Sequence, residues 1–198
     1  MKTRDFFTVS HVHLCVARGF TLIELMVTIF ILAILMTIAA PSFREYQRNS
    51  ELTSLTNTLL AAVNSARGEA MKYSTYAMVV PGAGADWNTG WRVFVDKNMN
   101  QTYDVNQDVL LLEQAALPNY ISIAGTGSAA GSSPSIIFNA SGYAGVGSTF
   151  SNVTINIQRN DVTGPRYTRR LKISKSGRAR VCRPVDESDT NCSSGSSD

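Results

Sequence analysis

Residues 20–40 form a run of 21 residues in which only four side chains are polar: Thr21, Glu24, Thr28 and Thr37. At about 1.5 Å of rise per residue, a helix of this length spans the roughly 30 Å hydrocarbon core of a bilayer. A helix in the core of a soluble domain normally keeps a polar face, and this run has none. The run therefore predicts one membrane-spanning helix near the N-terminus.

Two features distinguish this run from an ordinary membrane anchor. Glu24 lies five residues into it, where an unpaired carboxylate costs on the order of several kcal/mol. A polar stretch of 19 residues ends in Gly19 before the run begins, whereas an ordinary secretory signal is cleaved after its apolar core. Cleavage after Gly19 would leave the apolar helix as the mature N-terminus. A plain single-span anchor with a stray glutamate is the alternative.

The segment from Arg18 to Val27, Arg-Gly-Phe-Thr-Leu-Ile-Glu-Leu-Met-Val, resembles the processing site and N-terminal helix of type IV pilins and type II secretion pseudopilins. The resemblance implies that a prepilin peptidase cuts after Gly19 and that Phe20 becomes the N-methylated terminus. Other pilins in a filament would then be partners. In such a filament, Glu24 can pair with the terminal ammonium of Phe20 from a neighbouring subunit, which relieves the cost of its burial.

The apolar pattern continues past Pro41, which we expect to kink or locally melt the helix. Apolar side chains recur mostly at spacings of three and four over the next thirty or so residues, which predicts an amphipathic helix that packs on a sheet. These side chains are Phe43, Tyr46, Leu52, Leu55, Leu59, Val63, Ala66, Ala70 and Tyr73. The predicted organisation is a leader (1–19), a transmembrane and filament-core helix (20–41), its amphipathic half (42–74), a β-rich globular pilin domain (75–183) and a C-terminal tail (184–198).

After Tyr73, short β-rich runs alternate with Gly, Ser, Asn and Asp, whereas 125–134 reads as a loop. The predicted strands are 76–80, 91–96, 109–113, 120–124, 135–139, 152–158, 167–174 and 178–182. Many short strands behind one long helix predict an α+β fold, a helix packed on antiparallel sheets. This organisation, with Gly-Trp-Arg-Val-Phe-Val-Asp at 90–96, resembles the FimT/GspH branch of minor pilins and pseudopilins.

Residues 96–104 place oxygen ligands at alternate positions, like the start of a calcium loop. Gln101 and Gln107 stand where such a loop has Gly and Glu, and Asp and Asn also form turns by bonding their own backbone. We therefore interpret this segment as a β-turn and expect neither a metal nor a cofactor.

The mature chain would keep two cysteines, Cys182 and Cys192, because Cys15 lies in the leader. Two thiols ten residues apart in an exported chain indicate a disulfide that closes a small loop in an oxidising compartment. Both histidines, His11 and His13, are also in the leader. Without them the chain has no His-based triad or usual zinc site, and it has no Walker-type phosphate loop, so we do not expect an enzyme.

Basic residues gather near the C-terminus. Residues 166–183 hold eight basic side chains and no acidic one, whereas residues 20–165 hold seven basic and ten acidic side chains. The tail after Arg183 is acidic again. Such a local concentration of positive charge is typical of a polyanion site. A solvated basic strand, or one that faces acidic neighbours in a filament, is the alternative.

Strand alternation makes the polyanion hypothesis more specific. Lys-Ser-Gly at 175–177 predicts a hairpin turn, after which Arg178, Arg180 and Cys182 share one face and Ala179 and Val181 the other. Two guanidinium groups about 7 Å apart match neighbouring phosphates of a nucleic acid strand. Gly-Arg-Ala-Arg at 177–180 also resembles a Gly-Arg-X-Arg element of FimT proteins, which implies contacts from Arg178 and Arg180 to DNA during natural transformation.

The sequence thus leads to one functional hypothesis and one rival. The hypothesis is a minor type IV pilin that takes part in pilus assembly and binds extracellular double-stranded DNA during uptake through Arg178, Arg180, Lys172, Lys175 and Arg183, with little sequence specificity. The last three residues are added for their charge and proximity. The rival is a GspH-like minor pseudopilin of a type II secretion system, with a structural or priming role and no DNA contact.

Charges on either side of the span predict its orientation. Lys2, Arg4 and Arg18 precede the span, and Arg44 and Arg48 follow it. This slight bias favours a cytoplasmic leader. We therefore expect a single-pass protein of the bacterial inner membrane with a periplasmic globular domain, which becomes part of an extracellular pilus after assembly.

Overall fold

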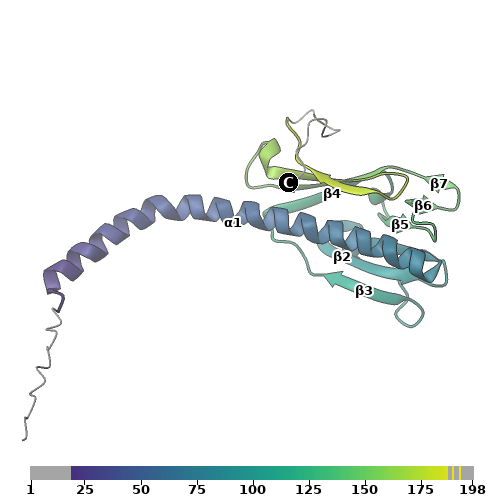
Figure 1. Cartoon of the computed structure of the whole chain (residues 1–198), viewed down its shortest axis with the longest axis horizontal. Helices are drawn as coiled ribbons and strands as arrows, with labels where there is room; N and C mark the ends of the chain where they lie inside the picture. The colour runs from purple at the N-terminus through teal and green to yellow at the C-terminus, as the bar shows by residue number, and fades with distance from the viewer. Residues whose placement is uncertain (1–18, 187–188, 190–191, 193–198) are drawn as a thin grey trace, which may run out of the picture. The chain divides into compact units, whose positions relative to one another are not determined.

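The computed structural model of the chain describes residues 19–186, 189 and 192. The predicted leader up to residue 18, with both histidines and Cys15, and most of the acidic tail lie outside the described residues. The chain divides into two compact units, residues 1–45 and 46–198. Helix α1 (Leu22–Tyr73) runs through the boundary, and all the strands follow it (Figure 1).

The first half of α1 is the predicted apolar helix. An 18-residue window of α1 reaches a mean hydropathy of 2.6 with none of it buried within the chain, so length and composition suffice for crossing a membrane. Helical structure continues without interruption through Pro41, so the expected local melting is not seen. A proline removes a single backbone hydrogen bond, and the turns on either side keep theirs.

The second half of α1 packs on the sheets along one stripe. Its buried residues are Leu52, Thr56, Leu59, Ala62, Val63, Ala66 and Ala70. The prediction was wrong for the ends of the stripe, because Phe43, Tyr46 and Tyr73 are 61%, 70% and 41% exposed. Periodicity marks which side of a helix is apolar, but the extent of burial depends on how much of that side the sheets cover.

Two four-stranded antiparallel sheets follow the helix, which confirms the predicted α+β class. The first sheet has the order β3-β2-β1-β5, formed by β1 (Tyr76–Ala83), β2 (Asp86–Asp96), β3 (Val109–Gln114) and β5 (Ile136–Phe138). The second has the order β10-β9-β8-β4, formed by β4 (Ile121–Thr126), β8 (Val153–Arg159), β9 (Thr168–Ile173) and β10 (Ala179–Cys182).

All eight predicted strands are present, with shifted ends. A small third sheet of β6 (Gly145–Val146) and β7 (Thr149–Phe150) was not predicted, because two-residue strands carry no alternation that a sequence pattern can reveal. The expected loop at 125–134 begins with the last residues of β4 and contains the short 3-10 helix η1 (Gly127–Ala129). A second 3-10 helix, η2 (Pro165–Tyr167), precedes β9.

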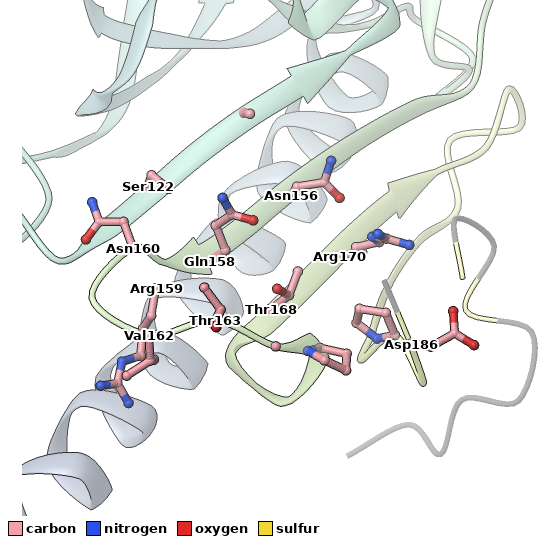
Figure 2. A pocket seen from close by; sticks show the side chains of 14 residues that line it. Ser122, Asn156, Gln158, Arg159, Asn160, Val162, Thr163, Thr168, Arg170 and Asp186 are labelled. Carbon is pink, nitrogen blue, oxygen red and sulfur yellow. The ribbon is translucent and has the colours of Figure 1, made fainter. Parts of the chain in front are cut away.

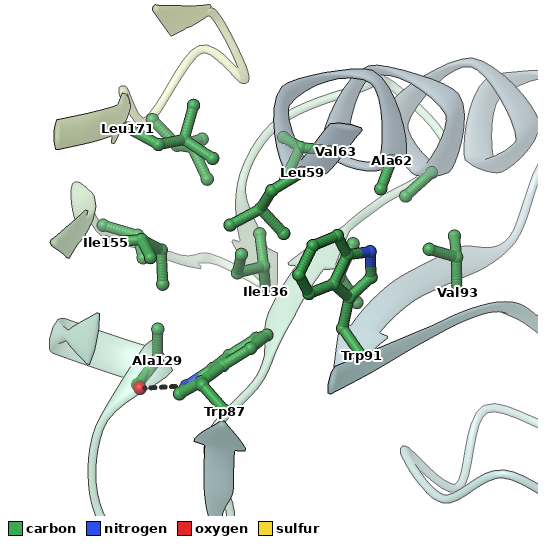
Figure 3. Close-up of a cluster of buried hydrophobic side chains, with 14 of the residues drawn as sticks. Leu59, Ala62, Val63, Trp87, Trp91, Val93, Ala129, Ile136, Ile155 and Leu171 are labelled. Atoms are coloured by element: carbon green, nitrogen blue, oxygen red, sulfur yellow. Dashed lines mark hydrogen bonds between the residues drawn. The ribbon is translucent and has the colours of Figure 1, made fainter. Parts of the chain in front are cut away.

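One hydrophobic core joins α1 to both sheets. Figure 3 shows Leu59 of α1 beside Trp91 of β2 and Leu171 of β9, all fully buried. The Trp87 indole satisfies its own N–H by donating to the carbonyl oxygen of Ala129 at 2.9 Å. Each sheet therefore turns one face towards the core, and its other face is available for other contacts.

The loop that resembled a calcium site covers part of the outer face of the first sheet. Tyr103 packs against Phe94 with ring centroids 5.2 Å apart. The buried carboxylate of Asp96 accepts backbone N–H bonds from Asn100 and Gln101 at 3.2 and 2.8 Å. The loop is thus stabilised by the Asx-type turns that its composition predicts.

A buried ion pair fastens the part of α1 that begins the second unit to the end of β8. The guanidinium of Arg159, whose side chain is 2% exposed, makes a bidentate contact with Asp161 at 2.9 and 2.8 Å and donates to the side-chain oxygen of Asn49 at 2.9 Å. Arg48 pairs with the same carboxylate. The hydrogen bond from Arg159 is the largest cause that lowers the pKa of Asp161 to about 2.

Candidate nucleic-acid interface

The basic C-terminal residues lie on a hairpin of β9 and β10. The two strands pair with Ala179 opposite Ile173, Arg180 opposite Lys172 and Cys182 opposite Arg170. The connecting turn is closed by hydrogen bonds from the Ser174 N–H to the Arg178 carbonyl at 3.0 Å and from the Gly177 N–H to the Ser174 carbonyl at 2.8 Å. The turn lies where Lys-Ser-Gly predicted it.

The side chains of β10 alternate between the two faces of the second sheet. Ala179 and Val181 pack against the core, whereas Arg178 and Arg180 are exposed on the other side. Cys182 shares the outward face but is only 4% exposed, because it forms a disulfide with Cys192. The two arginines therefore share the outer face.

Three of the five predicted DNA-binding residues meet at one hollow of about 710 Å³ on this face. Arg178 and Arg180 line it from β10 and its turn, and Lys172 lines it from β9. Amide and hydroxyl side chains complete the polar lining: Asn152, Thr154, Ser174 and Ser176. Sequence reasoning missed these four neutral residues, although the polar alternation through Asn152, Thr154, Asn156 and Gln158 could have indicated that β8 turns a polar face outward.

The remaining basic residues take different positions. Lys175 is exposed in the turn beside the hollow, and Arg183 is exposed just beyond the opposite end of β10. Arg169 faces the core side of β9, is 8% exposed and donates to the Thr53 hydroxyl of α1 at 3.3 Å. The basic cluster of 166–183 is therefore divided between two faces of the sheet, and sequence charge alone overestimates the outward patch.

The polar face continues into a second hollow of about 510 Å³. Figure 2 shows Asn156 and Gln158 of β8 beside Thr168 and Arg170 of β9, with Ser122 of β4 further along the face. Asn156 Oδ1 and Arg170 Nε are buried without a hydrogen-bond partner among the described residues. Asn156 pairs with Arg170 across the strands, so this buried acceptor and this buried donor lie on neighbouring residues beneath the second hollow.

The described residues of the C-terminal segment contact one end of this face. The disulfide joins Cys182 and Cys192 with 6.0 Å between their Cα atoms. Arg170 donates from Nη1 to the backbone carbonyl of Asp189, and Asp186 lines the second hollow. Acidic residues are thus close to Arg170, whereas Arg178 lies at the turn end of the hairpin.

At the other end of the chain, the predicted processing residues begin the described structure. The Phe20 side chain is 79% exposed. Glu24 caps the helix, because its carboxylate accepts the Thr21 N–H at 2.9 Å and the Glu24 N–H donates to the Thr21 hydroxyl at 3.3 Å. This reciprocal arrangement is a capping box, a role for Glu24 within a single chain that sequence reasoning did not consider.

A long N-terminal helix with an apolar first half, followed by two antiparallel sheets, defines the class of type IV pilin-like proteins. Residues 55–177 match the family described as Type II transport protein GspH, and residues 16–40 match the prokaryotic N-terminal methylation motif. The first match covers more than half of the chain, so this chain belongs to the GspH family and is a type IV pilin or pseudopilin of the GspH/FimT type.

Solved structures share the fold. Two crystal forms of the type IV minor pilin FimU from Pseudomonas aeruginosa PAO1 superpose with TM-scores of 0.52 at 19% sequence identity. The superpositions cover 71% and 68% of this chain and 98% of the FimU chain.

A curated relative matches over a short segment. "Prepilin peptidase-dependent protein D" of Escherichia coli K12 is 51% identical over 43 residues, which are 22% of this chain and 30% of that protein. The match thus spans less than a third of that relative's length.

Proposed function

We propose that this chain is a minor type IV pilin that binds extracellular double-stranded DNA through the outer face of the second sheet during DNA uptake. The observation that supports the proposal best is the convergence of Arg178, Arg180 and Lys172 on one polar hollow. Alternate residues of a strand lie about 7 Å apart, close to the spacing of successive phosphates on one DNA strand. The neutral lining residues add hydroxyl and amide groups that can donate hydrogen bonds to phosphate oxygens.

The proposal includes the processing and assembly steps implied by the N-terminal segment. A prepilin peptidase cleaves after Gly19, Phe20 is methylated, and Glu24 then pairs with the terminal ammonium of Phe20 from a neighbouring pilin. The apolar helix anchors the precursor in the inner membrane with residues 46–198 on the periplasmic side. After assembly the hairpin is carried into the pilus. The match to the N-terminal methylation motif supports the first of these steps.

The lining of the first hollow offers little for reading base sequence. Among the residues that line it there is no aromatic side chain on which a base could stack. We therefore expect phosphate contacts to dominate, with little preference among DNA sequences and a strong dependence on salt.

The structural rival remains a minor pseudopilin of a type II secretion system that primes or caps a filament without DNA. The family match to GspH favours it as much as it favours the pilus role. The two proposals differ in what they require of the outer face, since only the first needs Arg178 and Arg180.

The test is DNA binding by the full chain in zwitterionic detergent across a salt series, with wild type compared with Arg178→Ala/Arg180→Ala. Each lost phosphate contact makes the slope of log K against log salt less steep by about 0.9. If the affinities are taken as equal at 1 M salt, this change lowers the affinity at 0.1 M salt by roughly eightfold. The double variant should thus lose about 1.8 in slope and on the order of 60-fold in affinity.

A matched control removes two positive charges elsewhere. Lys72→Ala/Lys97→Ala changes the net charge equally; both lysines lie over the Tyr73 ring, and neither lines the hollow. This control should keep the wild-type slope. Absence of binding by wild type at low salt, or equal slopes for all three proteins, would reject the DNA proposal and leave the secretion role.

A further inference from the structure

A contact that supports the basic hairpin comes from α1. Arg67 donates from Nε to the carbonyl oxygen of Gly142 at 3.0 Å and from Nη2 to the carbonyl oxygen of Ser176 at 3.2 Å. These acceptors lie 75 and 109 residues further along the chain. One guanidinium group of α1 therefore bonds two separate chain turns, one at Gly142 and the other at Ser176.

The two turns are also joined directly. The Ala144 N–H, two residues beyond Gly142, donates to the Lys175 carbonyl at 3.0 Å. A separate bond, from the Lys175 N–H to the side-chain oxygen of Asn152 at 3.0 Å, ties the hairpin turn to the residue before β8. At Gly177, which has a φ of +79°, an added Cβ would lie 1.9 Å from the Gly142 carbonyl oxygen and 2.8 Å from Arg67 Nε. The backbone of the hairpin turn thus packs against the other turn with no room for a side chain.

This packing gives the glycine of the Gly-Arg-Ala-Arg segment a physical role. Gly177 permits the left-handed backbone and the close approach, and Arg178 follows it immediately. The direction in which Arg178 leaves the turn therefore depends on the contact of Gly177 with Gly142 and on the Arg67 fork. The planar guanidinium suits two carbonyl acceptors at once, which a lysine ammonium does less rigidly.

We propose that Arg67 is a positioning residue for DNA binding, which acts by holding the 174–178 turn so that Arg178 is oriented for phosphate before DNA arrives. This inference rests on the proposed function. A fixed turn loses less conformational entropy on binding than a free one, and this pre-organisation raises affinity without a new contact to the ligand. In this proposal Arg67 makes no phosphate contact itself: its Nε and Nη2 each donate to a backbone carbonyl, and its effect on DNA binding comes through the turn.

The first experiment is a double-mutant cycle on DNA binding by the full chain at 0.1 M salt. Arg67→Met should weaken binding by up to about eightfold, the contribution of one phosphate contact at this salt. In the Arg67→Met background, Arg178→Ala should cost about twofold or less, because its contact is already impaired. Lys172→Ala, which lies on β9 rather than in either turn that Arg67 bonds, should cost the same in both backgrounds and serves as the control.

Arg67→Lys separates geometry from charge. It keeps the positive charge but not the planar fork, so it should bind DNA within about twofold of Arg67→Met. Wild-type affinity in Arg67→Lys would overturn the proposal. Independent effects of Arg67→Met and Arg178→Ala, each lowering the salt slope by about 0.9, would also overturn it, since Arg67 would then be a phosphate contact itself.

A second experiment does not depend on DNA. Amide hydrogen exchange reports on the Ser174, Gly177 and Ala144 N–H groups, whose hydrogen bonds close and join the turns. Arg67→Met should speed their exchange by at least about tenfold while the β1–β2 pairing keeps its wild-type rates, because local opening needs less free energy than global unfolding. Unchanged exchange at the turn would overturn the positioning role.

The two experiments distinguish the possible failures. If wild type binds no DNA but Arg67→Met loosens the turn, the proposed function has failed and the proposal with it, while Arg67 remains a structural tie of the hairpin. If wild type binds DNA and neither the cycle nor the exchange responds to Arg67, only the positioning proposal has failed.

Discussion

Gly177→Ala tests the packing of the hairpin turn most directly. The new Cβ would lie 1.9 Å from the Gly142 carbonyl oxygen, far inside any real contact distance, and the neighbour is backbone rather than a flexible side chain. The left-handed φ of +79° adds a cost of about 1–2 kcal/mol for an L-residue. To remove the clash the two turns must separate, which breaks the two Arg67 hydrogen bonds at about 1 kcal/mol each.

These contributions predict a loss of about 3–4 kcal/mol in the free energy of unfolding. The assay is urea denaturation of oxidised residues 46–198, the compact unit that contains the whole described core. Gly84→Ala is the matched control, because Gly84 also has a left-handed φ, +58°, but a Cβ added there would meet nothing within 4 Å. The control should lose only the left-handed backbone cost of about 1–2 kcal/mol.

The difference between the two variants isolates the contact with Gly142. If Gly177→Ala unfolds within about 0.5 kcal/mol of Gly84→Ala, a difference typical of neutral surface changes, the turn is not packed against Gly142. The argument for Arg67 would then lose its geometric basis as well.

Two further predictions concern the ends of the second sheet. Asp161→Asn should lower stability at neutral pH by about 1–2 kcal/mol, after allowance for the partial exposure of the side chain, because the folded pKa of Asp161 is lowered from 3.8 to about 2. That contribution is present above pH 4 and is lost as pH falls towards 2, so urea unfolding of wild type and variant should converge there; a constant gap would contradict it. Reduction of the Cys182–Cys192 disulfide, which spans ten residues, should cost about 2–3 kcal/mol, whereas Cys182→Ser/Cys192→Ser should be insensitive to reductant. Free thiols in untreated residues 46–198, which hold only these two cysteines, counted with a thiol reagent, would show that the bond does not form.

Much of the fold could be predicted because local patterns dictate it. A period of 3.6 residues marks the apolar face of a helix and a period of 2 that of a strand. These periods correctly predicted the amphipathic half of α1 and eight of the strands that the structure contains. The prediction was wrong where burial depends on distant partners. Phe43 and Tyr46 continue the helical stripe, yet they are exposed, and nothing in their local sequence distinguishes them from Leu52.

In the candidate site, too, the local pattern predicted some features correctly and left others undecided. Alternation along β10 correctly separated Arg178 and Arg180 from Ala179 and Val181, since successive side chains of a strand must point to opposite faces. The same rule, applied to the predicted strand that became β9, would have excluded Arg169 from the basic face. The predicted DNA-binding residues did not include Arg169, but the count of eight basic side chains over 166–183 was not divided between the two faces.

The sequence by itself determined the class of this protein: an apolar helix after a Gly-Phe junction, an amphipathic continuation, many short strands and a local excess of positive charge. These are properties of neighbouring residues, which a linear pattern records directly. Only the tertiary structure decided that Asn152 and Thr154 share a hollow with Lys172, Arg178 and Arg180, and that Arg67 reaches Gly142 and Ser176. Those contacts join residues up to 109 positions apart, and their distances follow from how the helix and sheets pack, which no spacing along the chain specifies.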